Sequence, residues 1–305
     1  MHTATRRNFV LGAGSLAAAT AFGPRRAFAF VNAPKAMRYG YTAMTWGKEE
    51  KQAIDDIAAV GYAGIQFRID AVTEFKPAEL RDLLAQHKLT FVALSGGEVS
   101  IDPAVEADEI AKQVANAKFL HEAGGLYLQV LDQLKPYPRT VTPDEAKRLG
   151  QLLTKIGKQV ADVGIQLGYH NHMNTISEHP SNLDIVLENA DPKYVKLELD
   201  TAHAVAGGGD PAAMIEKYGD RLLFLHLKDA VDIPLGSENS KYPFKFVELG
   251  RGRVDFPAVF AALNKVKFAG WAVVELDRVP DKARSPKECA MISRDYLAGK
   301  FGAKF

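Results

Sequence analysis

Imidazole and carboxylate side chains stand at the ends of four short apolar segments in the second half of this 305-residue chain. If these segments are strands, residues two positions apart share one face, so the side chains at each end can converge on one point. Imidazole together with carboxylate suits a divalent ion such as Mn, Fe, Co or Zn better than Ca. The candidate metal ligands are therefore His170, His172, Asp200, His226 and Glu275, with the choice between the first two left open.

Composition narrows the chemistry further. The only cysteine is Cys289, which excludes an intramolecular disulfide framework and a zinc cluster of several thiolates, so any metal must be held by His, Asp and Glu. The chain has 38 Lys+Arg and 37 Asp+Glu, a net charge of +1, which gives no basic footprint for nucleic acid. With 47% apolar residues, it has the composition of an ordinary globular protein.

The rest of the chain supplies elements that could bring these residues together. A short apolar or β-branched run alternates eight times with a segment of helical period. Eight such units predict a single-domain α/β fold, the (β/α)8 or TIM barrel, whose site lies at the carboxyl ends of the strands. The predicted strands are residues 37–44, 62–69, 89–95, 126–131, 165–170, 195–200, 222–227 and 271–276.

The segments between the strands have the pattern of helices. An open doubly wound sheet is the alternative, but a G-x-G-x-x-G turn is expected after one of its early strands, and none is found there. Gly207-Gly208-Gly209 is interpreted as a loop, and the long unassigned stretch 230–254 as a functional loop on the face that carries the site. The predicted helices lie near residues 48–60, 77–87, 104–123, 142–163, 181–190, 211–218, 255–266 and 285–299.

The first 29 residues are predicted to be a cleaved twin-arginine signal peptide. Arg6 and Arg7 precede an uncharged apolar run over residues 10–22, and Ala27-Phe28-Ala29 has the small-x-small cleavage pattern. The apolar run is shorter than the roughly 20 residues that span a bilayer. We therefore expect export to the periplasm, a barrel formed by residues 30–305, and no membrane attachment after cleavage.

Removal of this segment changes the charge balance. It contains four arginines and no acidic residue, so the remaining 276 residues carry 34 basic and 37 acidic side chains, a net charge of −3. A nucleic-acid partner becomes less favoured still.

Several motifs taken together resemble the sugar isomerase/epimerase superfamily with the xylose isomerase-like barrel, in particular its inosose dehydratase-like members. The resemblance extends over residues 37–299. It implies a divalent metal cofactor (Mn, Co, Fe, Zn or Mg) and a small sugar or keto-sugar substrate. The motifs are Tyr169-His170-Asn171-His172-Met173, Leu199-Asp200-Thr201-Ala202-His203, His226-Leu227-Lys228-Asp229, Gly250-Arg251-Gly252-Arg253-Val254-Asp255-Phe256 and Trp271-Ala272-Val273-Val274-Glu275.

One ligand position departs from the pattern of this family. Its members hold the metal with Glu, Asp, His and Glu, and Asp200, His226 and Glu275 match the last three. At the first position His170 stands where many members have Glu, and His172 could serve instead. The epimerases use two Glu carboxylates to remove and return a proton, so a His in place of one Glu favours a reaction with one base and a separate acid.

The reaction expected from the resemblance is proton abstraction next to a carbonyl, leading to isomerisation, epimerisation or elimination from a keto-sugar. The metal would act as a Lewis acid on the substrate oxygens. Candidate catalytic residues are Glu275, His172, His203 and Lys228, and candidate substrate-binding residues are Arg68, Gln129 and Trp46.

Two other functions stay open. A metal-dependent phosphodiesterase of the AP endonuclease IV type would need several metals and a basic face, which the net charge of −3 disfavours. A non-catalytic periplasmic sugar-binding barrel would not need an inward cluster of imidazoles and carboxylates. The sequence does not name the sugar, and it is compatible with a homo-oligomer.

Overall fold

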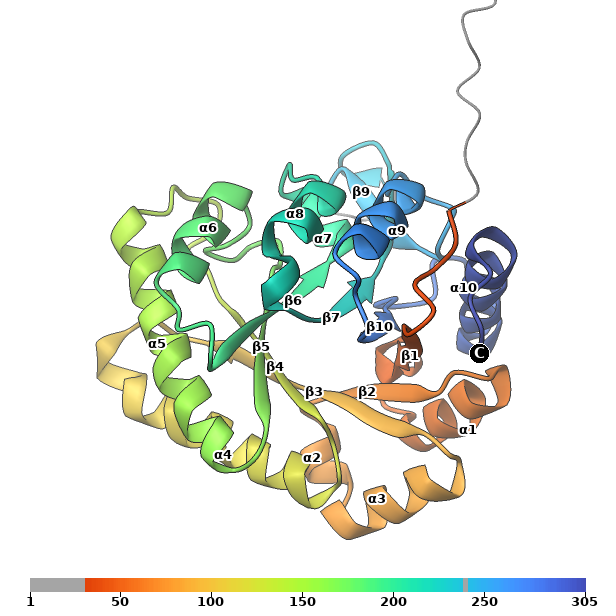
Figure 1. Ribbon diagram of the computed structural model, residues 1–305, viewed down its shortest axis with the longest axis horizontal. Coiled ribbons are helices and arrows are strands. Elements are labelled where there is room, and N and C mark those ends of the chain that lie inside the picture. The colour runs from red at the N-terminus through yellow and green to blue at the C-terminus, as the bar shows by residue number, and fades with distance from the viewer. Residues whose placement is uncertain (1–30, 238–240) are drawn as a thin grey trace, which may run out of the picture. The chain divides into compact units, whose positions relative to one another are not determined.

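The computed structural model describes residues 31–237 and 241–305, and residues 31–305 form one compact unit. At its centre is a closed barrel of parallel strands in the order β1-β10-β7-β6-β5-β4-β3-β2, with helices around it (Figure 1). This confirms the predicted (β/α)8 barrel. The barrel strands are β1 (Arg38–Thr42), β2 (Gly64–Arg68), β3 (Thr90–Val99), β4 (Tyr127–Asp132), β5 (Gln166–His170), β6 (Val195–Asp200), β7 (Leu222–Leu227) and β10 (Trp271–Val274).

The barrel closes through its first and last strands, where Arg38 of β1 lies opposite Trp271 of β10. Near the amino ends of the strands the interior is filled by large apolar side chains, among them Val92, Phe224 and Trp271. These strands are mainly apolar because both of their faces are covered. The side chains nearer the carboxyl ends are polar, and they form the site described below.

The main helices lie where the sequence predicts them. Thr142 and Ser285 begin α5 and α10 with capping boxes, in which the hydroxyl accepts from the N–H of the Glu three residues on. Proline at the first helical position strengthens both starts. The main helices are α1 (Glu50–Val60), α3 (Pro77–Gln86), α4 (Glu106–Glu122), α5 (Pro143–Asp162), α6 (Pro180–Glu188), α8 (Pro211–Tyr218), α9 (Phe256–Lys265) and α10 (Pro286–Phe301).

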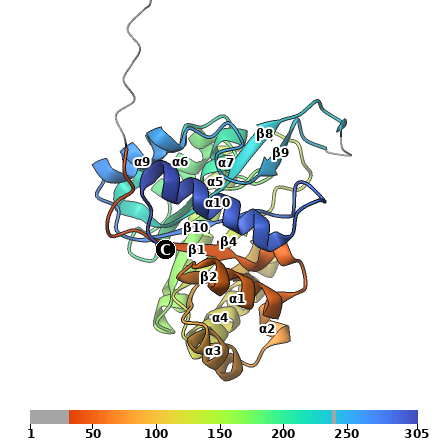
Figure 2. The same ribbon diagram turned by 90° about the vertical axis from the view of Figure 1, so that its right-hand side faces the viewer.

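Several short elements were not predicted. The stretch 230–254 contains much of an antiparallel hairpin of β8 (Asp229–Asp232) and β9 (Phe244–Val247), which Figure 2 shows beyond the barrel strands. Helix α7 (Thr201–Ala206) begins directly at the end of β6, and the Gly207–Gly209 loop follows it as predicted. The remaining short elements are α2 (Ala71–Glu74), η1 (Ala43–Trp46), η2 (Pro103–Val105) and η3 (Gly219–Arg221).

A buried carboxylate fastens the hairpin to the segment that leads into α9. Asp229 accepts hydrogen bonds from the backbone N–H groups of Ala230, Gly250, Gly252 and Val254 at 2.8 to 3.1 Å. A Cβ at position 252 would lie 2.2 Å from Asp229 Oδ1, so glycine is required there for the close approach. Gly250 and Gly252 therefore let the backbone approach and bind the Asp229 carboxylate.

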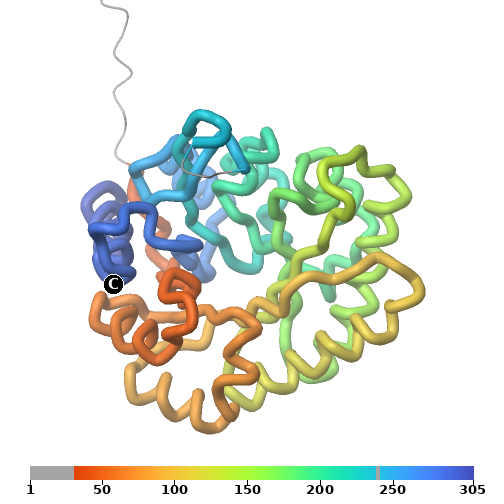
Figure 3. The backbone as a smooth tube through the Cα atoms, turned by 180° about the vertical axis from the view of Figure 1, so that it is seen from behind, coloured from red at the N-terminus to blue at the C-terminus, as the bar shows by residue number. Residues whose placement is uncertain are grey.

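The two ends of the described unit meet. Ala33 donates its backbone N–H to Phe301 O at 2.8 Å, and Figure 3 shows the chain end beside the first helices. Within the described ranges, no helix combines the length and the apolar character needed to cross a bilayer. The predicted signal peptide, residues 1–29, lies outside the described residues, so export stays a prediction.

Candidate metal and active site

Four buried side chains meet at the carboxyl ends of four neighbouring strands. His170 ends β5, Asp200 ends β6, His226 lies in β7, and Glu275 follows β10. One possible ligand atom from each lies within 4.8 Å of the others. All four residues are at most 5% exposed. Parallel strands of a barrel present their carboxyl ends at the same face, which explains why residues so far apart in sequence converge. We call them the four-ligand group.

His226 lies at the centre of the four-ligand group. Its Nδ1 is 3.2 Å from Glu275 Oε2 and 3.7 Å from Asp200 Oδ2. Its Nε2 is 2.9 Å from Gln66 Oε1, an oxygen that can only accept, so Nε2 carries a hydrogen. This leaves Nδ1 as the atom that faces the carboxylates and could bind a cation.

The four-ligand group fits a divalent cation. Asp200 Oδ2 and His226 Nδ1 are buried and make no hydrogen bond of good geometry, although oppositely charged atoms lie close by. Buried polar atoms are normally paired, so unpaired atoms that face one point indicate a place for a bound group. Two imidazoles with two carboxylates form a donor set suited to Mn, Fe, Co or Zn.

Glu198 is a site residue that the sequence analysis did not nominate. It is fully buried on β6, two residues before Asp200. Its Oε2 contacts His170 Nδ1, and its Oε1 lies 3.2 Å from His226 Nδ1. Burial raises the pKa of Glu198 to about 8, against the opposing effect of His226. Strand alternation placed Glu198 on the same face as Asp200 and could have identified it.

Lys228 and Glu275 hold each other in the charged form. Lys228 Nζ lies 2.9 Å from Glu275 Oε2 and 2.5 Å from Asp277 Oδ1. Burial alone would lower the pKa of Lys228, but the two carboxylates outweigh it and raise the pKa. Burial would raise the pKa of Glu275, but His226 and Lys228 hold it well below its usual range. The site therefore contains a fixed ammonium next to a fixed carboxylate.

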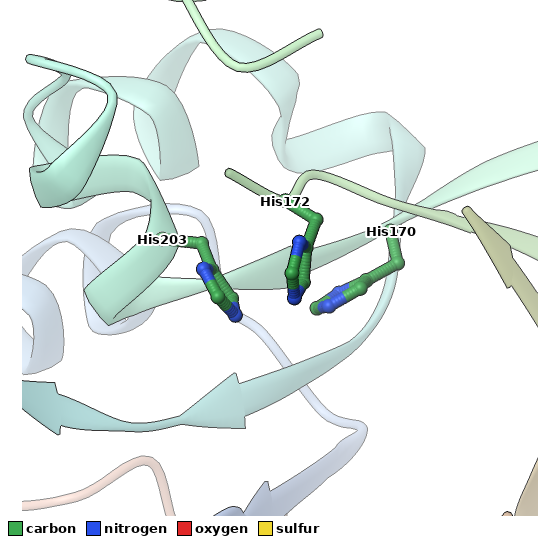
Figure 4. Close-up of side chains that lie close together, drawn as sticks. All are labelled: His170, His172 and His203. Carbon is green, nitrogen blue, oxygen red and sulfur yellow. The ribbon is translucent and has the colours of Figure 1, made fainter. Parts of the chain in front are cut away.

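A second group consists of three imidazoles, His170, His172 and His203. Figure 4 shows them side by side, from the end of β5, the loop after it, and α7. The ring centroids of His172 and His203 are 3.7 Å apart. Burial lowers the pKa of His170 to about 3 and of His172 to about 4, and holds that of His203 well below its usual range. All three rings are therefore neutral at pH 7.

The backbone determines which nitrogen of His172 is available. Its Nδ1 lies 2.5 Å from Met173 O, and because a carbonyl only accepts, Nδ1 carries the hydrogen and Nε2 the lone pair. His172 and His203 line a pocket of about 560 Å³. His170 thus belongs to both groups that could hold a metal ion, whereas His172 belongs to the group of three imidazoles and also lines the pocket.

Of the three candidate substrate-binding residues, Gln129 lies nearest to the four-ligand group. It is buried, and its Oε1 accepts a hydrogen bond of 3.3 Å from Gln66 Nε2. Because Gln66 in turn contacts His226, Gln129 is placed behind a candidate metal ligand.

Arg68 and Trp46 lie elsewhere. Arg68 donates to Gly47 O at 3.3 Å and pairs with Asp70 at 3.0 Å. The indole N–H of Trp46 donates to Asp56 Oδ2 at 3.0 Å, and the ring is buried in the core. In the part of the chain that the structure describes, neither residue lines the pocket beside His172, so their role in substrate binding stays a prediction.

Comparisons with known proteins agree with the architecture. A family model described as xylose isomerase-like TIM barrel matches residues 54–295. Inosose dehydratase from Lacticaseibacillus casei is 28% identical over 276 residues, 82% of this chain and 90% of that protein. The crystal structure of the IOLI protein with a bound zinc atom is similar in fold, with a TM-score of 0.73 at 18% identity over 88% of this chain and 100% of that one. The 3-keto-D-glucoside 4-epimerase of E. coli matches with a TM-score of 0.68 at 18% identity over 86% and 99%.

Proposed function

The chain belongs to the xylose isomerase-like TIM barrel family, and on this basis we propose that it is a divalent-metal-dependent enzyme that acts on a sugar or keto-sugar by removing a proton next to a carbonyl. The convergence of His170, Asp200, His226 and Glu275 beside a pocket carries this proposal. Relatives named inosose dehydratase, which align over 82 to 84% of the chain, support a sugar-modifying enzyme.

Within this class, elimination of water from a keto-sugar suits the side chains best. An imidazole, His170, stands where a two-carboxylate proton exchange would need a second Glu. The remaining Glu275 is held ionised by His226 and Lys228, and its Oε2 is already engaged by the Lys228 ammonium at 2.9 Å. His172 lines the pocket and carries its lone pair on Nε2, so we assign removal of the proton to it.

In the reaction that we propose, one side chain removes the proton and returns it to the leaving hydroxyl. A cation bound by the four-ligand group would supply Lewis-acid stabilisation of the negative charge on the substrate oxygens. His172 Nε2 takes the proton from the carbon next to the carbonyl, and the C–H electron pair forms a C=C bond. The hydroxyl on the following carbon leaves as water with the proton that the His172 imidazolium returns, so that one imidazole serves as base and acid in place of the separate acid that the sequence favours. His203, whose ring centroid lies 3.7 Å from that of His172, holds that hydroxyl.

The experiment is incubation of the metal-loaded protein with a panel of keto-sugars and 3-keto-glycosides in D2O, followed by NMR. We expect a product that has lost one hydroxyl and carries deuterium on the carbon that bore it, because the enol left by elimination takes a solvent proton there when it becomes a ketone. Exchange without loss of water would point to epimerisation or isomerisation. No exchange with any member of the panel, in protein whose metal content has been verified, would disprove the proposal.

A substitution separates an enzyme from a sugar-binding barrel. In E275Q the carboxylate becomes a neutral amide, so we expect weaker metal binding and loss of turnover. E188Q, an exposed position on α6, is the matched control and should behave as the unmodified protein. A protein whose sugar affinity survives E275Q, and which shows no turnover even before the substitution, would be a binding module instead.

A further inference from the structure

None of the four-ligand group is among the described residues that line the pocket beside His172 and His203. Its volume of about 560 Å³ falls within the roughly 300–1,000 Å³ of pockets that take drug-sized ligands. One wall is the β8–β9 hairpin, and the other is the segment 277–282 that follows β10. It therefore offers contacts to parts of a ligand that lie beyond the reacting carbons.

A row of aromatic rings follows the hairpin side of this pocket. The ring of Phe246 lies 5.1 Å from that of His203. The centroids of Phe244 and Phe246 are 5.6 Å apart, and those of Tyr242 and Phe244 are 5.7 Å apart at 24°. Asn174 Nδ2 donates to Tyr242 OH at 2.5 Å, which fixes the third ring. Such a row is suited to contact with the flat face of another ring.

Cationic side chains also line the pocket, namely Lys241, Lys245, Arg278 and Lys282. Its acidic lining residue in the described ranges is Asp277, and that carboxylate is paired with Lys228 at 2.5 Å. This excess of positive charge contrasts with the net charge of −3 for residues 30–305. A pocket lined by one sign of charge attracts ligands of the other sign.

We propose that this pocket is a second subsite, which receives the part of the substrate beyond the reacting sugar, and that this part is a flat ring bearing a carboxylate or phosphate. The ring would pack against the aromatic row, and its oxyanion would meet Arg278 and Lys282, since guanidinium and ammonium groups bind both anions. The inference rests on the proposed function, because His172 and His203 mark the reacting end.

The test uses four β-D-glucopyranosides as probes: methyl, phenyl, 4-carboxyphenyl and 4-phosphonooxyphenyl. Their dissociation constants for the metal-loaded protein are measured by calorimetry at low and high NaCl. We expect phenyl to bind more tightly than methyl, and one oxyanion probe about tenfold more tightly than phenyl. The oxyanion gain should shrink as salt screens the charges. The stronger of the two oxyanion probes identifies the anion.

The double variant R278Q/K282Q should lose the oxyanion gain and keep the preference for phenyl over methyl. Both positions are exposed, so folding should be preserved. K51Q/K118Q, which removes two exposed lysines outside the pocket, is the matched control and should keep the gain. Equal affinities for phenyl and both oxyanion probes, a gain that R278Q/K282Q leaves intact, or no binding of any probe would overturn the subsite.

The subsite and the proposed reaction fail in different ways. Deuterium exchange on neutral keto-sugars with no preference for an oxyanion would overturn the subsite and leave the reaction standing. An oxyanion preference that R278Q/K282Q abolishes, without exchange on any keto-sugar, would uphold an anion-binding pocket and overturn the reaction.

Discussion

His170 and His172 leave the same strand two positions apart, yet their surroundings give them different chemistry. The Nδ1 of His170 contacts Glu198 Oε2, and the ring is a member of the four-ligand group. In His172, Nδ1 donates to a backbone carbonyl and Nε2 faces away from it. Gln66 orients the ring of His226 by accepting a hydrogen bond from its Nε2. Outer partners of this kind typically change metal affinity by about 10–100-fold when they are removed.

Substitution of the two histidines should therefore have separable effects. In H170A the four-ligand group loses one donor, so we expect metal affinity to fall by at least about tenfold. In H172N we expect metal binding to persist and turnover to fall by about 10²–10⁴, the usual contribution of a general base. Calorimetric titration with Mn, Co and Zn, combined with the deuterium assay, measures both.

Each variant is the control for the other. Equal loss of metal in both would place His172 among the ligands, and a fully active H172N would exclude it as the base.

Asp200 connects two elements of the site. Its Oδ1 accepts the backbone N–H of His203 at 2.8 Å and caps α7, while its Oδ2 faces His226. The Thr201 hydroxyl then donates to Lys228 O at 2.7 Å and accepts the backbone N–H of Lys228 at 3.0 Å. A helix of six residues thereby sets the position of His203 against the neighbouring strand.

The Asp229 carboxylate should decide the stability of the hairpin. Its two oxygens accept from four N–H groups, whereas the amide in D229N has one oxygen and would direct N–H groups at two donors. We expect D229N to lose about 2–3 kcal/mol of unfolding free energy, as for hydrogen bonds to a charged group. Urea unfolding and hydrogen exchange at residues 244–254 measure the effect.

The control is D232N, since Asp232 pairs with Arg253 on the exposed side of the hairpin. It should change stability little, and a D229N protein as stable as D232N would contradict this role.

The start of α5 should contribute a stability term that depends on pH. Arg139 and the Thr142 N–H lower the pKa of Glu145 from 4.5 to about 2. Because the folded-state pKa is depressed, this stabilisation is complete above pH 4.5 and is lost as the pH falls through 2. We expect E145Q to be less stable than the unmodified protein at pH 7 and to approach it near pH 2.

Thermal unfolding of both proteins from pH 7 to pH 2 tests this prediction. D144N serves as the control because Asp144 is 89% exposed. A stability difference for E145Q that does not change with pH would contradict the assignment.

The elements differ in how far the sequence could predict them. Buried parallel strands are continuous apolar runs, and β6 and β7 have the predicted bounds. Strand β3 runs on to Val99, past the predicted end at Ser95, because the register shifts across two glycines that resemble a break. Helix α7 is too short to show a helical period, and β8 and β9, with four residues each, are too short to show the alternation of a strand.

The site shows the same division. The alternation of side chains gave the face of each ligand, and Asp200, His226, His170 and Glu275 do meet. It does not give depth along the barrel, so Glu198 was overlooked. The burial of Trp46 in the core depends on tertiary packing that no local sequence pattern encodes.

At the scale of the whole molecule, a bound metal should stabilise the fold because it ties together four strands. Saturation of a site at 100 times its dissociation constant adds about 2.7 kcal/mol. In a protein of this size we expect chelation by EDTA to lower the melting temperature by roughly 5–10 °C. Calorimetry before and after EDTA, with metal content measured in parallel, gives the result.

E275Q should melt at the same temperature with and without EDTA if its site no longer holds metal. An unchanged melting temperature in unmodified protein that has demonstrably lost its metal would contradict the coupling of site and fold.

The pairing of the first strand with the last has a consequence for biosynthesis. Thr45 donates to Leu276 O across 231 positions of sequence, and Glu275 stands next to that acceptor. While a ribosome is still extending the chain, β1 and β7 are therefore open edges that could pair with other chains. The four-ligand group is also incomplete until β10 and Glu275 have emerged. Binding of an ion would therefore report that translation has passed that strand and that the barrel has closed.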